Sequence, residues 1–140
     1  MPPPTNAFDL RFDEPSQRLL GTWRADVTDA GLRADYERLL AQARAHRCRF
    51  WLLDLRGRAW HSAEFGRWFT DEFAAQSHAA LRRPVFIACV LGAAHYAAVD
   101  APSAQALQVG CIEHNLYTYY FNNLPDAQAW LEYQQQLDVA

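Results

Sequence analysis

Hydrophobic and charged residues alternate with a period of two at the start of the chain, which is typical of a strand with one solvent-facing side. Phe8, Leu10 and Phe12 carry the apolar half of this pattern. The turn-forming residues 14–17 separate it from a second strand-like segment, 18–25. The two segments together predict an antiparallel hairpin.

Two later segments show the period of about 3.6 residues that marks a helix packed on one side. Thr28 is a suitable N-cap for the first helix, which we expect to end near 46–47. Ser62 can cap the second helix, which Pro84 stops. The apolar faces comprise Leu32, Tyr36, Leu39, Leu40 and Ala43 in the first helix, and Phe65, Trp68, Phe69 and Phe73 in the second.

Two nearly continuous apolar runs, 50–55 and 85–91, indicate parallel strands that are covered on both faces. The aromatic segment 116–121 predicts a last strand. Asn123 then caps a final helix. The residues of this helix that we expect to point inward are Ala127, Trp130 and Leu131.

The order of these elements, β-β-α-β-α-β-α-β-α, predicts an α/β fold. We expect a mixed, mostly parallel sheet of about five strands, opened by the antiparallel hairpin, with about four helices. The helix from about 101 to 111 rests on a weaker pattern than the others. A chain of 140 residues, 51% of them hydrophobic, has the size and composition of one globular domain, so we expect a single domain over 1–140 with 1–6 as a frayed lead-in.

The charge balance excludes some classes of partner and chemistry. A formal net charge of −3 gives no overall attraction to nucleic acid or to anionic lipid. All 13 basic residues are arginine, so Schiff-base and phosphate-loop chemistry that needs lysine is excluded. The arginine bias has two explanations, the codon usage of a GC-rich genome or selection for planar anion binders.

The cysteines and the N-terminus predict a soluble, cytoplasmic protein without a membrane span. Cys48, Cys89 and Cys111 are widely spaced and match no zinc-finger pattern, which favours reduced thiols. The first residues lack the basic and apolar segments of a signal peptide. No apolar run reaches the roughly 18 residues that a transmembrane helix needs.

The element order and certain segments resemble STAS-like domains related to anti-sigma-factor antagonists, in the branch grouped with lipid-binding STAS domains. The segments that carry the resemblance are the opening hairpin, 51–57, 83–88, 120–121 and 129–131. Together they span almost the whole chain, as a likeness of pattern and topology. The resemblance implies that a partner or a small ligand binds at the loop and helix after the central strand.

In the anti-sigma-factor antagonists, that loop carries a phosphorylatable serine at the start of the helix. Ser62 lies close to the corresponding position. The Asp-Ser-Ser-Gly cluster of the family is replaced here by Trp-His-Ser-Ala-Glu at 60–64. The resemblance therefore supports the fold and leaves open whether Ser62 is phosphorylated.

The loop 56–64 is the strongest candidate site, because it leaves the carboxyl end of a central strand, where α/β sheets bind ligands. Arg56, Arg58, His61 and Ser62 would surround a helix N-terminus, which attracts anions. These residues predict a site for an anionic ligand or a carboxylate of a partner. The alternative is that Ser62 only caps the helix and that the arginines are solvated.

Three further residues complete the candidate binding set. Trp60 either covers the sheet or is exposed as an anchor for a partner. His95 and Tyr96 follow the second buried strand, so we expect them to line the same pocket as Arg58; a surface loop is the alternative.

The sequence predicts no catalytic residue, no metal site and no cofactor. The five histidines show no metal-binding spacing, and the GxSxG motif is absent. His61 and Asp54 could be imagined as an acid–base pair, but a carboxylate within a strand more often accepts hydrogen bonds. A small hydrolase that uses His61 is therefore unsupported.

Two functions remain open. The preferred prediction is a non-enzymatic binding or regulatory module that acts through protein–protein contacts, with a homodimer suggested by the aromatic residues Trp60, Tyr96, Tyr117 and Tyr119. The alternative is a domain that binds an anionic or lipid-like small molecule between the loops 56–62 and 95–96. An aromatic-lined cavity with Arg58 at its mouth would favour the small molecule, and a filled loop region would favour the protein partner.

Overall fold

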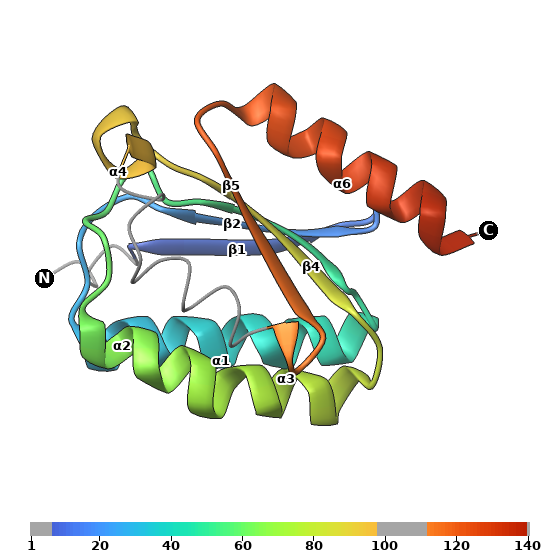
Figure 1. Ribbon diagram of the computed structural model, residues 1–140, viewed down its shortest axis with the longest axis horizontal. Coiled ribbons are helices and arrows are strands. Elements are labelled where there is room, and N and C mark those ends of the chain that lie inside the picture. The colour runs from blue at the N-terminus through green and yellow to red at the C-terminus, as the bar shows by residue number, and fades with distance from the viewer. Residues whose placement is uncertain (1–6, 98–111, 140) are drawn as a thin grey trace, which may run out of the picture.

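A five-stranded sheet with strand order β1-β2-β3-β4-β5 organises the fold (Figure 1). The computed structural model describes residues 7–97 and 112–139. The β1–β2 pair is antiparallel and the other pairs are parallel, which confirms the predicted mixed α/β fold. The strands are β1 (Phe8–Asp13), β2 (Arg18–Trp23), β3 (Phe50–Asp54), β4 (Val85–Val90) and β5 (Leu116–Phe121).

The helices form layers on both sides of this sheet (Figure 1). The helix α1 and the continuous helix α2–η1–α3 cover one face, and α6 covers β3, β4 and β5 on the other. The bounds are α1 (Asp29–His46), α2 (Ala63–Trp68), η1 (Phe69–Phe73), α3 (Ala74–Leu81), α4 (Ala93–Ala97) and α6 (Leu124–Val139). The predicted lead-in 1–6 and the predicted helix 101–111 lie outside the described residues.

Each N-cap that the sequence predicts is confirmed by a side-chain hydrogen bond. Thr28 Oγ1 accepts from the backbone N–H of Gly31 at 3.0 Å, and Ser62 Oγ accepts from that of Phe65 at 3.0 Å. Asn123 Oδ1 accepts from the backbone N–H of Asp126 at 2.8 Å. These bonds satisfy donors that the first turn of a helix otherwise leaves open, so they fix where the helices begin.

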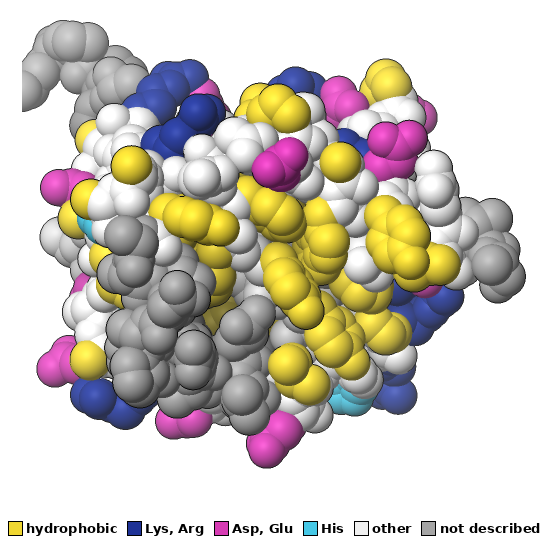
Figure 2. All heavy atoms as spheres, turned by 45° about the horizontal axis from the view of Figure 1, so that its top comes forward, with side chains coloured by type: hydrophobic (Ala, Val, Ile, Leu, Met, Phe, Trp, Pro, Cys, Tyr) yellow, Lys and Arg dark blue, Asp and Glu magenta, His cyan; other side chains and the backbone are white. Residues whose placement is uncertain are grey.

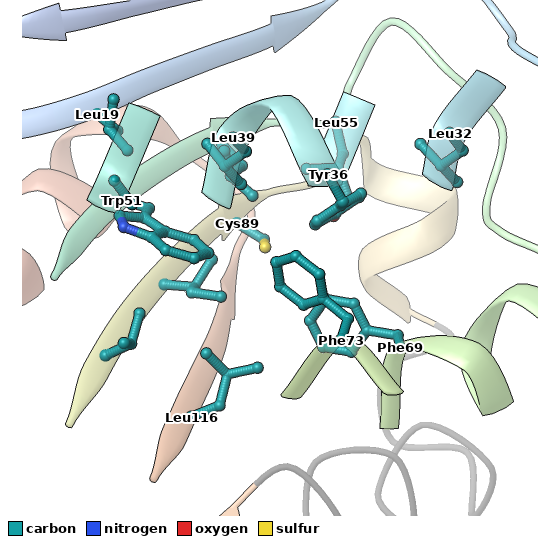
Figure 3. Packing of buried hydrophobic residues seen from close by; sticks show 14 of the residues in the cluster. Leu19, Leu32, Tyr36, Leu39, Trp51, Leu55, Phe69, Phe73, Cys89 and Leu116 are labelled. Carbon is teal, nitrogen blue, oxygen red and sulfur yellow. The ribbon is translucent and has the colours of Figure 1, made fainter. Parts of the chain in front are cut away.

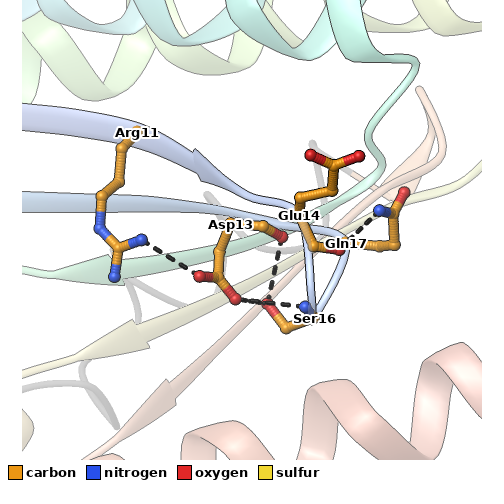
Figure 4. Close-up of polar contacts among 5 residues, drawn as sticks. All are labelled: Arg11, Asp13, Glu14, Ser16 and Gln17. Carbon is orange, nitrogen blue, oxygen red and sulfur yellow. Dashed lines mark hydrogen bonds and ion pairs between the residues drawn. The ribbon is translucent and has the colours of Figure 1, made fainter.

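The β1–β2 turn is stabilised by side chains that fold back on the backbone (Figure 4). Asp13 Oδ2 accepts from the hydroxyl of Ser16 at 2.6 Å and from its backbone N–H at 3.2 Å. Gln17 adopts the left-handed conformation, with φ 57°, and donates to the carbonyl oxygen of Glu14. The strand β2 ends at Trp23, two residues before the predicted end, because Trp23 pairs with Phe8, the first residue of β1.

The second helix departs from a regular α-helix in its middle. Residues Phe69–Phe73 form a π-helical turn, in which the backbone N–H of Ala74 donates to the carbonyl oxygen of Phe69. Phe69 and Phe73 both pack against Tyr36 of α1, with ring centroids 5.4 Å apart in each case (Figure 3). Both rings lie on the apolar face that the sequence predicts, whereas the π-helical turn itself is not predicted.

Candidate functional site

The loop between β3 and α2 is held tightly against the β2–α1 connection. The backbone N–H of Ala59 donates to Asp26 Oδ1 at 2.6 Å, and the Ser62 hydroxyl donates to Asp29 Oδ2 at 2.7 Å. A Cβ added at Gly57 would lie 2.1 Å from the carbonyl oxygen of Trp23, so the loop passes where only glycine fits. These contacts position the side chain of the next residue, Arg58.

Arg58 is buried, with 5% of its surface exposed. Its Cζ lies 4.6 Å from the centroid of the Trp23 ring, and its Nη1 donates to the carbonyl oxygen of Ala59 at 3.1 Å. Its Nε and Nη2 are shielded from solvent and have no hydrogen-bond partner among the described residues. An unsatisfied buried guanidinium is costly, because it loses its hydration and gains no acceptor in exchange.

A second buried arginine shows how such a group is normally satisfied. Arg49 is 7% exposed, and its Nη1 donates to the carbonyl oxygen of Pro84 at 2.8 Å. Its Nη2 pairs with the carboxylate of Asp138 on α6 at 2.5 Å. No described acidic side chain pairs with Arg58 in this way. The difference between the two arginines marks the surroundings of Arg58 as unusual.

Arg58 lines a small cavity between the sheet and the helices α1 and α2–η1–α3. Its volume is about 20 Å³, which is room for roughly one water-sized group. None of the described lining residues is acidic. The lining residues are Tyr36, Leu55, Arg58, Trp60, His61, Phe65, Phe69, Ile87, Cys89, Thr118 and Tyr120.

Trp60 and His61 form one wall of the cavity and pack against each other, with ring centroids 4.4 Å apart and ring planes tilted by 32°. Burial, together with the positive charge of Arg58, lowers the pKa of His61 to about 4, although Asp29 acts in the opposite direction. His61 is therefore neutral at pH 7, and one ring nitrogen can accept a hydrogen bond. The cavity thus combines one guanidinium, one neutral imidazole and aromatic walls.

Cys89 lines the cavity as a protonated thiol. Burial raises the pKa of this thiol to about 12, an effect that the charge of Arg58 only partly offsets. Because the thiolate is the nucleophilic form, a thiol of this kind is unreactive at neutral pH. Figure 3 shows the Cys89 sulfur at the centre of the aromatic cluster. Cys89 therefore contributes apolar surface to the cavity.

Of the seven residues predicted from the sequence, Arg58, Trp60 and His61 lie together on the cavity. Arg56 does not line the cavity and pairs with Asp54. Burial works to raise the pKa of Asp54, but hydrogen bonds and charge from Arg56 together hold it below its ordinary value. The Ser62 hydroxyl serves as the helix cap.

The two residues expected from the next loop lie outside the cavity lining. The His95 ring packs near Trp60, with centroids 6.4 Å apart, and Tyr96 is 40% exposed. Both belong to the short helix α4, which begins at Ala93, and neither lines the cavity beside Arg58.

The residues that sequence reasoning missed come from other elements. Trp23 of β2 supplies the platform under Arg58, and Tyr36 of α1 supplies a wall. Thr118 and Tyr120 reach the cavity from β5. By its hydrophobic period, each of these residues belongs to the predicted core or to a predicted strand. That period does not indicate which core residue borders a cavity.

Comparison of the chain with family models, with curated proteins and with solved structures gave no match. Within residues 7–97 and 112–139, no group of three or more His, Cys, Asp and Glu residues is placed to hold a metal ion. None of the helices in these ranges is both long enough and apolar enough to cross a membrane.

Proposed function

We propose that this chain is a non-enzymatic cytoplasmic binding module whose ligand is a small anion held by Arg58 in the aromatic-lined cavity. The observation that carries the proposal is the buried guanidinium of Arg58, which has two nitrogens without a partner among the described residues. An acceptor with a negative charge would satisfy both nitrogens and offset the cost of burying them. Of the two functions that the sequence left open, this is the small-molecule alternative.

The surroundings of Arg58 support a ligand rather than an internal partner. The Trp23 ring and the Ala59 carbonyl oxygen fix the guanidinium in place, so a ligand would meet a preorganised donor. The walls of the cavity are aromatic, with few polar groups, which is the lining of small-molecule sites, and the volume of about 20 Å³ restricts the ligand to a small one. The buried and unpaired Cys48 and Cys89 fit a reducing compartment.

A thermal-shift assay with chloride, formate, acetate, sulfate and phosphate tests this function. We expect at least one anion to raise the melting temperature by several degrees, because a ligand at 100 times its dissociation constant adds about 2.7 kcal/mol. The variant Arg58→Met should lose this response. Without ligand it should be at least as stable as the native protein, because the substitution removes an unsatisfied buried charge.

The matched control is Arg49→Met, which removes the buried arginine that has partners. It should cost about 2 kcal/mol of stability, because it leaves Asp138 with only the longer 3.5 Å pair to the exposed Arg83, and it should keep the anion response. A native protein with no anion response, or a response that persists in Arg58→Met, would contradict the proposed function.

A second candidate function, contact with a protein partner or with a second copy of the chain, is favoured by exposed apolar side chains along β5 and α6. Tyr119, Tyr133 and Leu137 are 49%, 57% and 53% exposed. A band of hydrophobic side chains crosses the face of the molecule that carries α6 (Figure 2). Surfaces of this kind are common at protein interfaces. If two copies pack through it, light scattering at high micromolar concentration will give twice the mass of the monomer, and a monomer mass excludes self-association.

A further inference from the structure

The two unsatisfied nitrogens of Arg58 lie on the same edge of its guanidinium. Nε and Nη2 point to one side of this planar group, and Nη1 is engaged with Ala59. Two parallel N–H donors on one edge match an acceptor with two oxygens in one plane. The site therefore favours a ligand with two oxygens in one plane, one for each nitrogen; we call this arrangement a fork.

The neighbouring arginine makes such a fork with a carboxylate. Arg56 Nε lies 2.9 Å from Asp54 Oδ1, and Arg56 Nη2 lies 2.7 Å from Asp54 Oδ2. The same two nitrogens are the unsatisfied pair in Arg58. Arg56 therefore has a carboxylate on the edge formed by its Nε and Nη2, whereas the same edge of Arg58 has no acceptor among the described residues.

The charges around the cavity set the charge of the ligand. None of the described lining residues is acidic, and His61 is neutral at pH 7 because burial and Arg58 lower its pKa to about 4. Arg58 therefore contributes one unbalanced positive charge. A monoanion neutralises it, whereas a dianion such as sulfate or doubly charged phosphate would bring an excess negative charge into surroundings of low polarity.

The cavity also limits the size of the ligand. Its volume of about 20 Å³ is room for roughly one water, so a carboxylate enters only if the walls beside Arg58, which include Trp60, Phe65 and Tyr120, move apart. Any remainder of the ligand would contact apolar and aromatic side chains. A short carbon chain fits these walls better than a second charged group.

We infer that the ligand is a short organic monocarboxylate, bound through both of its oxygens to Nε and Nη2 of Arg58. This inference rests on the proposed function, since it names the class of anion that the same cavity takes. It predicts that the charge alone does not suffice for binding. The planar pair of donors is required as well.

Calorimetric titration with acetate, propionate, acetamide and phosphate tests the inference, with native protein and the variants Arg58→Lys and Arg58→Met. We expect the native protein to bind propionate at least tenfold more tightly than phosphate, and not to bind acetamide, which has the shape of acetate without its charge. The variant Arg58→Lys keeps the charge and loses the fork, so it should bind propionate at least tenfold more weakly. Arg49→Lys, on the other buried arginine, should leave propionate binding unchanged.

The outcomes separate the inference from the proposed function. Phosphate or sulfate that binds more tightly than the carboxylates, and is lost in Arg58→Met, would overturn the carboxylate class and leave an anion site at Arg58. Undiminished propionate binding in Arg58→Lys would overturn the fork. The absence of any anion binding that depends on Arg58 would overturn both the inference and the proposed function. Thermal melts of each variant without ligand confirm that a loss of binding is not a loss of folding.

Discussion

Replacing Gly57 with alanine is expected to lower the free energy of unfolding by about 3 kcal/mol. The added Cβ would lie 2.1 Å from the carbonyl oxygen of Trp23 and 3.0 Å from the Cα of Arg24. Both neighbours are backbone atoms of the connection that leaves β2, so no rotation of a side chain relieves the contact. Either the loop or that connection must move, and Arg58 moves with it.

Urea denaturation measures this effect, and Gly92→Ala is the matched control. A Cβ at Gly92 meets no described atom within 4 Å, so that variant should stay within about 1 kcal/mol of the native protein. Gly57→Ala should also weaken any anion response, because the loop sets the position of Arg58 over Trp23. Equal stability of the two variants would show that the loop does not depend on the close approach at Gly57.

The elements with strong hydrophobic periods could be predicted from the sequence because burial alone determines them. The apolar run at 50–55 is covered by helices on both faces, and its residues Trp51 and Leu53 are completely buried. Caps such as Ser62 are equally local, since they need only one side chain and the next turn of backbone. The π-helical turn at Phe69–Phe73 could not be predicted, because the hydrophobic period of this segment is the same for a regular α-helix.

The candidate site was only partly predictable for a similar reason. Topology brings the loop after β3 to the carboxyl edge of the sheet, and that step follows from the sequence. The burial of Arg58 does not follow from the sequence, because it depends on contacts with other elements. Trp23 of the hairpin lies under the guanidinium, and Asp26 holds the loop by accepting a hydrogen bond from Ala59. By sequence pattern Arg56 and Arg58 are equivalent. In the structure, one forms an exposed ion pair and the other is buried.

The STAS-like resemblance remains a prediction about family, and one of its implications can be examined at Ser62. The Ser62 hydroxyl caps α2 and donates to Asp29 Oδ2 at 2.7 Å. A phosphate group at this oxygen would replace that hydrogen bond with repulsion between two negative groups. The geometry gives Ser62 a structural role as the cap of α2.

The stability of the ligand-free protein should fall by up to about 3 kcal/mol between pH 6.5 and pH 4 through His61 alone. In the folded protein, burial and then Arg58 lower the pKa of His61 from 6.5 to about 4, against the opposing charge of Asp29. Between these values the unfolded chain binds the proton and the folded protein does not. Acid therefore favours the unfolded state. The folded protein has its full stability only above pH 6.5, and the loss due to His61 is complete below pH 4.

Urea denaturation of native protein and of His61→Phe across this pH range isolates the effect, because the carboxylates titrate in both proteins and cancel in the difference. The native curve should lose stability more steeply than that of the variant as the pH falls, and the His61 resonance should titrate near pH 4. Parallel curves, or a titration near the ordinary value, would contradict the burial of this ring beside Arg58.

A monoanion bound to Arg58 would offset the charge that lowers the His61 pKa. Saturating propionate should therefore move the titration of His61 to higher pH, and Arg58→Met should abolish this ligand-induced shift.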